Sequence, residues 1–223
     1  QMGLFLGPLY TLHKAATAIV LARRLAAETG ARVVPLFWLQ TEDHDFAEIA
    51  TALTPKRDGT LLRSQLHEAP SETRCSVAQR SLGGEIVKVL DELFAELEGR
   101  PHTSEVEALL RASYRQGARL PAAFAQVLAT IFAEEGLVLL DPRNVACATL
   151  AAPLVRRAIA DWQPIEAQLI AQTAALAAAG FSAPIELRAG SPLPFFHQDT
   201  PTGPDLSAFA GQVRTPTPSG CPP

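Results

Sequence analysis

Two short apolar runs separated by a helical pattern constrain the fold more than any other feature of this 223-residue sequence. Residues 3–6 form the first run, which stops at Gly7-Pro8, and residues 33–39 form the second. Between them, apolar residues keep helical spacing over residues 11–28. Strand, turn, helix and strand within forty residues are typical of two parallel strands joined by a helical crossover. Because both runs are continuously apolar, we expect a sheet that is covered on both faces.

The remaining sequence predicts further helices and one or more later strands. A four-residue apolar run at 137–140 ends at Asp141 and predicts another buried strand, and residues 184–188 and 193–197 are candidate strands. Helices are predicted over residues 82–97, 106–114, 122–132, 144–159 and 164–179. The pattern therefore predicts an α/β fold with a parallel sheet and a helical insertion around residues 82–135.

The two ends of the sequence suggest a fragment. Gln1 opens directly onto an apolar run, so we expect the chain to begin inside a fold. Residues 200–223 are rich in Pro, Gly, Ser and Thr and are predicted to be an irregular or disordered tail, because such a composition buries too little surface to offset its ordering entropy. We therefore predict a core over residues 1–199 and a tail over residues 200–223.

Composition argues against several classes of function. The formal net charge is −4 and no run of Lys and Arg stands out, which argues against a nucleic-acid partner. No apolar run reaches the roughly 18–20 residues of a membrane span. Cys75, Cys147 and Cys221 are odd in number and lack metal-ligand spacing, so neither a disulfide framework nor a zinc site is predicted. Free thiols of this kind are typical of a reducing cytoplasm.

The segment GPLYTLHKA, residues 7–15, is the first candidate site. A helix that starts directly after a strand end presents free amide groups and roughly half a positive charge, which suits a phosphate. His13 can donate a hydrogen bond to phosphate oxygens, and Lys14 can supply a positive charge. The alternative is that both are ordinary polar residues at a helix start.

The segment Thr41-Glu42-Asp43-His44-Asp45 is the second candidate site, at the end of the second apolar run. Ligands of parallel sheets gather beyond the carboxyl ends of the strands, and Asp141 marks a further such end. Carboxylates grouped around a histidine can hold Mg²⁺, orient an amine or act as a base. The alternative is a plain helix cap, made by Thr41 or Asp43.

Other single residues are assigned structural roles. Trp38 is predicted to lie in the core. The histidines at positions 67, 102 and 197 are predicted to lie on the surface.

The first segment resembles the signature of class I aminoacyl-tRNA synthetases and nucleotidyltransferases, in which a Gly-Pro turn leads into His-x-Gly-His. Tyr10 replaces the first histidine, Leu12 replaces the glycine, and His13 matches the second histidine. A fuller resemblance is to the BshC family, the cysteine-adding enzymes of bacillithiol biosynthesis. It is carried by QMGLFLGPLYTLHKA, VVPLFWLQTEDHDFAEI and GLVLLDP, in that order.

The resemblance implies a Rossmann-like core with inserted segments, and a later coiled coil, absent here, that makes a homodimer. It implies a cytoplasmic ligase that joins cysteine to glucosaminyl-malate, with ATP as the expected cofactor and Mg²⁺ as a candidate ion. For this reaction we assign, as a hypothesis, nucleotide binding to Gly7, Pro8, Tyr10, Thr11 and His13, catalysis to His13, Lys14, His44 and Asp45, and substrate binding to Trp38, Thr41, Glu42 and Asp43.

Two other functions fit the same residues. One is a nucleotidyltransferase that adenylates a small acid and releases pyrophosphate. The other is a non-catalytic nucleotide-binding scaffold. Whether AMP or ADP is formed would separate the ligase from the nucleotidyltransferase. The fragment alone could be inactive and monomeric even where its parent is neither.

Overall fold

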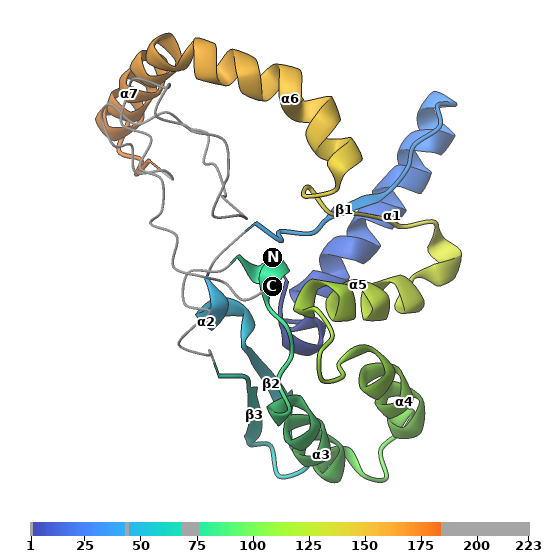
Figure 1. Ribbon diagram of the computed structural model, residues 1–223. Helices are drawn as coiled ribbons and strands as arrows, with labels where there is room; N and C mark the ends of the chain where they lie inside the picture. Colours follow the sequence, from blue (N-terminus) through green and yellow to red (C-terminus); the bar gives the residue numbers. More distant parts are fainter. Residues whose placement is uncertain (1, 43–44, 68–75, 184–223) are drawn as a thin grey trace. The chain divides into compact units, whose positions relative to one another are not determined.

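The computed structural model describes residues 2–42, 45–67 and 76–183, which form two compact units, residues 2–144 and residues 145–183 (Figure 1). Each unit is described by itself. In chain order the first contains η1 (Leu4–Leu6), α1 (Tyr10–Thr29), β1 (Leu36–Trp38), α2 (Phe46–Ile49), β2 (Thr51–Pro55), β3 (Leu61–Gln65), η3 (Val77–Gln79), α3 (Glu85–Leu97), α4 (Thr103–Ser113), α5 (Leu120–Ile131), η4 (Ala133–Glu135) and β4 (Val138–Leu140).

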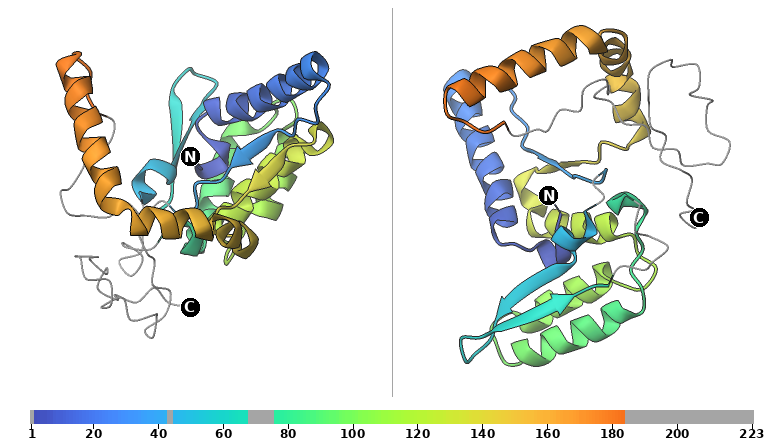
Figure 2. Two further views of the ribbon diagram at one scale, coloured as in Figure 1. Left: turned by 90° about the horizontal axis from the view of Figure 1, so that it is seen from above. Right: turned by 90° about the vertical axis from the view of Figure 1, so that its left-hand side faces the viewer.

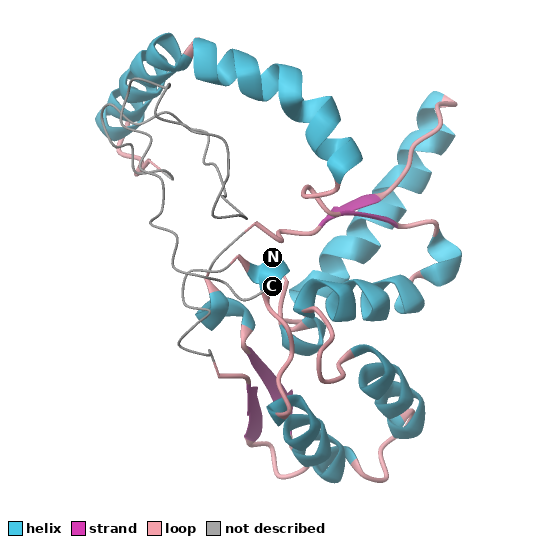
Figure 3. Cartoon of the chain, viewed as in Figure 1, coloured by secondary structure: helices cyan, strands magenta, loops and turns pink. Residues whose placement is uncertain are grey.

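The parallel pair of this unit is formed by β1 and β4 (Figure 3). Leu36 pairs with Val138 and Trp38 with Leu140, so the two strands end at the same edge. The predicted parallel sheet and the strand at residues 137–140 are therefore confirmed, and the α/β prediction with them.

The apolar run at residues 3–6 is not a strand, and that prediction was wrong. It forms the turn η1, in which the Gly7 amide donates to the Leu4 carbonyl at 2.9 Å. Phe5 and Leu6 take left-handed backbone angles, with φ of 52° and 62°. The chain doubles back so closely that a Cβ on Gly3 would lie 1.9 Å from the Gly7 carbonyl oxygen. Burial of Leu4 and Leu6, rather than strand pairing, explains why this run is apolar.

One face of β1 is covered and the other is not, within the part of the chain that the structure describes. Phe37 is buried, and its ring lies 6.2 Å from that of Phe124 on α5. Its strand neighbour Trp38 points to the other face and is 56% exposed. The expectations of a sheet covered on both faces and of Trp38 in the core were therefore wrong.

An antiparallel hairpin of β2 and β3 follows α2 and was not predicted from the sequence. Its turn contains Asp58-Gly59, a strong hairpin signal. Gly59 has φ of 84°, which glycine adopts without steric cost. The Thr60 hydroxyl donates to the Asp58 carboxylate at 2.6 Å and lowers the pKa of Asp58.

Helices α3, α4 and α5 supply a large part of the core of the first unit, and all three were predicted. Tyr114, directly after α4, is fully buried and stacks edge-on against Phe5 at 5.0 Å between ring centroids. Burial raises the pKa of the Tyr114 hydroxyl. The core thus links the turn η1 to the helices.

The second unit consists of α6 (Val145–Ala160) and α7 (Trp162–Ala178), both predicted (Figure 2). Neither helix contains a buried residue. No helix in the described ranges is long and apolar enough to span a membrane. The strands expected at 184–188 and 193–197, and the tail at 200–223, lie outside the described residues, and the division at residue 199 stays a prediction.

Candidate functional site

The carboxyl ends of β1 and β4 meet at a hydrogen-bonded polar edge. The Thr41 hydroxyl donates to Oδ1 of Asp141 at 2.6 Å, and the Arg143 amide donates to the same oxygen at 3.0 Å. Thr41 is 0% exposed, so this hydrogen bond is shielded from water on the threonine side. Two strand ends that the sequence marked as candidate ligand positions therefore lie together, as expected for a parallel sheet.

A third segment, which contains Ser76 and the turn η3, contacts this edge. The Ala78 amide donates to the Thr41 carbonyl at 3.0 Å, and the Arg143 guanidinium donates to the Ser76 hydroxyl at 3.0 Å. Ser76 also forms a capping box with Gln79. The edge is therefore held by loops that are far apart in the sequence.

The start of α1 carries the first predicted segment. Helix α1 runs antiparallel to β1, so its first turn lies on the same side as the strand's carboxyl end (Figure 2). That turn contains no acidic residue and no side-chain cap. His13 and Lys14 are exposed, and the Lys14 ammonium lies 4.5 Å from the centroid of the Tyr10 ring. Pro8 is exposed as well, while Gly7 is half-buried.

The Thr11 hydroxyl gives a test of whether this turn suits an anion. Thr11 is 1% exposed, and its Oγ1 has no hydrogen-bond partner among the described residues. A buried hydroxyl without a partner is costly, so a ligand oxygen or water at this position would stabilise it. The Thr11 and Leu12 amides of the first turn donate to the Pro8 and Leu9 carbonyls at 2.9 and 3.1 Å, so the expectation of free amide groups was wrong for these two. What the turn offers a phosphate-bearing ligand such as ATP is its side chains: the Thr11 hydroxyl, an imidazole and an ammonium group.

The second predicted segment is only partly described, because Asp43 and His44 lie outside the described residues. Asp45 caps α2, and its Oδ1 accepts from the Glu48 amide at 3.3 Å. A helix cap is thus present, although at Asp45 rather than at Thr41 or Asp43. Glu42 is exposed. Among the described residues, no group of three His, Cys, Asp or Glu side chains could hold a metal ion.

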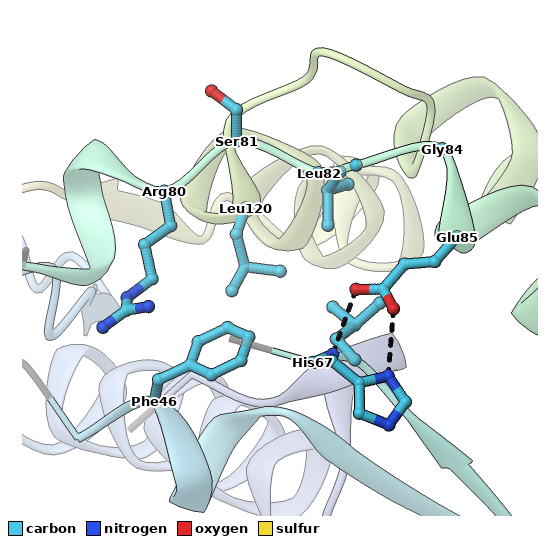
Figure 4. Close-up of a pocket in the computed structure, with 10 residues that line it drawn as sticks. Phe46, His67, Arg80, Ser81, Leu82, Gly84, Glu85 and Leu120 are labelled. Atoms are coloured by element: carbon cyan, nitrogen blue, oxygen red, sulfur yellow. Dashed lines mark hydrogen bonds and ion pairs between the residues drawn. The ribbon is translucent and has the colours of Figure 1, made fainter. Parts of the chain in front are cut away.

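A cavity of about 420 Å³ opens beside α2, and sequence reasoning missed it (Figure 4). None of the described residues predicted for the site lines it. Its polar lining comes mainly from Arg80, Glu85 and His67, and His67 was predicted only as a surface residue. The available signal was Gly83-Gly84 directly before a strongly amphipathic helix, a pattern that permits close approach by a ligand.

Residues 1–201 match the family model described as "Bacillithiol biosynthesis BshC, N-terminal Rossmann-like domain". The chain belongs to this family. The predicted resemblance and the Rossmann-like fold class are thereby confirmed.

Relatives of the BshC family agree with this assignment. A protein of Koribacter versatilis named "Putative cysteine ligase BshC" is 38% identical over 199 residues, which are 89% of this chain and 36% of the relative. Proteins of the same name from Salinibacter ruber and Bacillus cytotoxicus are 35% and 28% identical, over 83% and 84% of this chain and 34% and 35% of their own lengths. The chain therefore spans about a third of the length of these relatives.

Proposed function

We propose that this chain is the N-terminal part of an ATP-dependent ligase that joins L-cysteine to glucosaminyl-malate. The observation that carries the proposal is the match to the BshC family over residues 1–201, together with relatives named as cysteine ligases. Because the chain spans about a third of those relatives, the active species is the whole protein, for which the resemblance implies a homodimer.

The start of α1 is proposed to bind the phosphates. His13 donates to phosphate oxygens, and Lys14 balances their charge from the same exposed turn. Gly7, Pro8 and Tyr10 shape the approach, and the Thr11 hydroxyl offers a donor that the described residues leave without a partner. ATP, when bound, would supply the phosphoryl or adenylyl group that activates the carboxylate of cysteine. The amine of glucosaminyl-malate would then displace phosphate or AMP from it and lose a proton as the amide forms.

The polar edge beyond β1 and β4 is proposed to position the reacting groups. The hydrogen bond from the Thr41 hydroxyl to Oδ1 of Asp141, at 2.6 Å, fixes the two strand ends relative to each other. The adjacent segment, with Glu42 and Asp45 exposed, holds the amine or an ion bound to phosphate. Asp43, His44 and Trp38 complete the set of residues assigned to this reaction from the sequence.

The test is an assay of the full-length protein in which ATP, cysteine and glucosaminyl-malate are each omitted in turn. Ligation requires all three, and the mass of the nucleotide product distinguishes ADP from AMP. Replacing His13→Ala should lower turnover by about 100-fold, because a positioned donor to the transferred group is lost. The matched control Thr17→Ala changes another exposed residue of α1 and should leave turnover unchanged.

Two results would count against this proposal. Equal turnover of the His13→Ala variant and the wild type would remove the assigned role of His13. Binding of nucleotide without any consumption would favour the non-catalytic scaffold.

A further inference from the structure

The cavity beside α2 has opposite charges at its two ends (Figure 4). Arg80 lies at one end, where its guanidinium stacks over the Phe46 ring at 4.5 Å from the centroid. Glu85 lies at the other end with His67. Leu66, Leu82 and Leu120 contribute the apolar lining.

Packing holds the Arg80 side chain in place. Arg80 is 1% exposed, and its guanidinium is packed against the Phe46 ring. A guanidinium has five N–H donors, so it can bind a ligand oxygen while it keeps its other contacts. Planar carboxylates are its natural partners, because the two groups form parallel hydrogen bonds.

The Glu85 carboxylate is fixed as well. As the first residue of α3 it accepts from the His67 amide at 3.0 Å, and its other oxygen lies 3.0 Å from the His67 Nδ1. A carboxylate has about four acceptor positions, so a ligand amine can still bind there. The His67 ring is largely exposed and can turn aside. Glu85 also disfavours a ligand whose only charges are negative.

We propose that this cavity binds a small molecule that carries both a carboxylate and an amine, with the carboxylate toward Arg80 and the amine toward Glu85. A volume of about 420 Å³ lies within the usual range for small-molecule pockets. Phe46 directly follows Asp45, so the cavity adjoins the segment assigned to substrate binding.

Both substrates of the proposed reaction have this chemistry. Cysteine and glucosaminyl-malate each carry an amine and at least one carboxylate. The choice of these two probes rests on the proposed function, whereas the requirement for an amine and a carboxylate comes from Arg80 and Glu85.

Calorimetric titration of the full-length protein without ATP tests the proposal. Cysteine is compared with 3-mercaptopropionate, which lacks the amine, and glucosaminyl-malate with its N-acetyl derivative. At least one substrate should bind. Glu85→Gln should weaken the binding of that substrate about tenfold or more, because a hydrogen bond to a charged group is lost. The same substitution should leave the affinity for the analogue without a basic amine unchanged.

The matched control is Glu92→Gln, which removes an exposed carboxylate from the same helix and should not change either affinity. Arg80→Lys keeps the charge but removes the planar pair of donors. It should weaken the binding of the substrate more than the binding of cysteamine, which has no carboxylate. Circular dichroism checks that each variant is folded.

The proposal is overturned if Glu85→Gln and Glu92→Gln bind the substrates equally, or if neither substrate binds the wild type. It is also overturned if Glu85→Gln weakens the binding of the analogues as much as the binding of the substrates. Because binding is measured without ATP, a protein that binds a substrate here but does not ligate would support the cavity and contradict the proposed function. If Glu85→Gln changes neither ligation nor the affinities, that result would contradict the proposed cavity and leave the proposed function standing.

Discussion

The two units of the described chain use apolar residues in opposite ways. In residues 2–144, α3 and α5 each bury a full stripe of side chains, and Phe124 and Leu128 are 0% exposed. In residues 145–183, α6 and α7 are also rich in Ala, Val, Leu and Ile, yet neither buries a residue, and Leu150 is 80% exposed. Helical propensity and apolar content are therefore not enough to form a core.

The difference lies in the pattern of the apolar residues. On α3 they form one stripe that faces the core, with polar residues elsewhere. On α7 small apolar residues occur on all sides, so no single face is set apart for packing. Because tertiary packing supplies most helical stability, the first unit should account for most of the free energy of folding of the described chain.

The largest predicted effect is the difference in stability cost between two matched leucine substitutions, one in each unit. Leu128→Ala should lower the free energy of unfolding by about 2–5 kcal/mol, because it leaves a cavity in a packed core. Leu150→Ala makes the same change on α6 and should stay within about 0.5 kcal/mol. Urea unfolding followed by circular dichroism measures both. A cost for Leu150 near that of Leu128 would break the comparison, since it would mean that α6 is covered in the whole protein.

A smaller effect is predicted for the polar groups that the first unit buries. Thr41→Val removes the hydroxyl that donates to Asp141 and should cost about 1–3 kcal/mol, because a carboxylate oxygen loses a donor. The counterpart in the second unit is Thr149→Val, whose exposed hydroxyl bonds only to the Val145 carbonyl one turn earlier. We expect it to change stability by less than about 0.5 kcal/mol in the same urea titration. Equal costs would show that burial does not set the difference.

The smallest effect depends on pH. Burial raises the pKa of Tyr114 in the folded state, whereas an unfolded tyrosine titrates near pH ~10. The stability from the neutral phenol is therefore complete below about pH 10 and is lost above it, by up to about 1.4 kcal/mol per pH unit. Tyr114→Phe should remove this extra loss between pH ~9 and ~11. If the free energy of unfolding falls equally with pH in the wild type and in Tyr114→Phe, the phenol ionises as readily in the folded state as in the unfolded state.

Local patterns predicted the helices well, because each helix repeats its signal over three or more turns. The strand prediction at residues 3–6 failed because four apolar residues are buried equally well by a turn. The pairing of β1 with β4 was not foreseen either, since pairing depends on partners that are distant in sequence. The hairpin was missed although Asp58-Gly59 signalled its turn.

The candidate site divides along similar lines. Polar residues after strand ends are visible in sequence, and Thr41 and Asp141 do meet. The cavity was not visible, because Arg80, Glu85 and Phe46 come from separate elements that only the fold brings together. His67 was predicted as a surface residue, and its exposure agrees, but its contact with Glu85 could not be inferred from spacing.

The hydrogen bond between Thr41 and Asp141 joins residues 100 positions apart. Closing a flexible loop of that length costs about 4 kcal/mol of chain entropy plus a constant, whereas α3, α4 and α5 form through contacts between neighbours. The intervening helices should therefore fold first and shorten the distance that the chain must search. The strand ends would then come together in one of the last steps of folding, so a newly made chain acquires its structural frame before it acquires the polar edge.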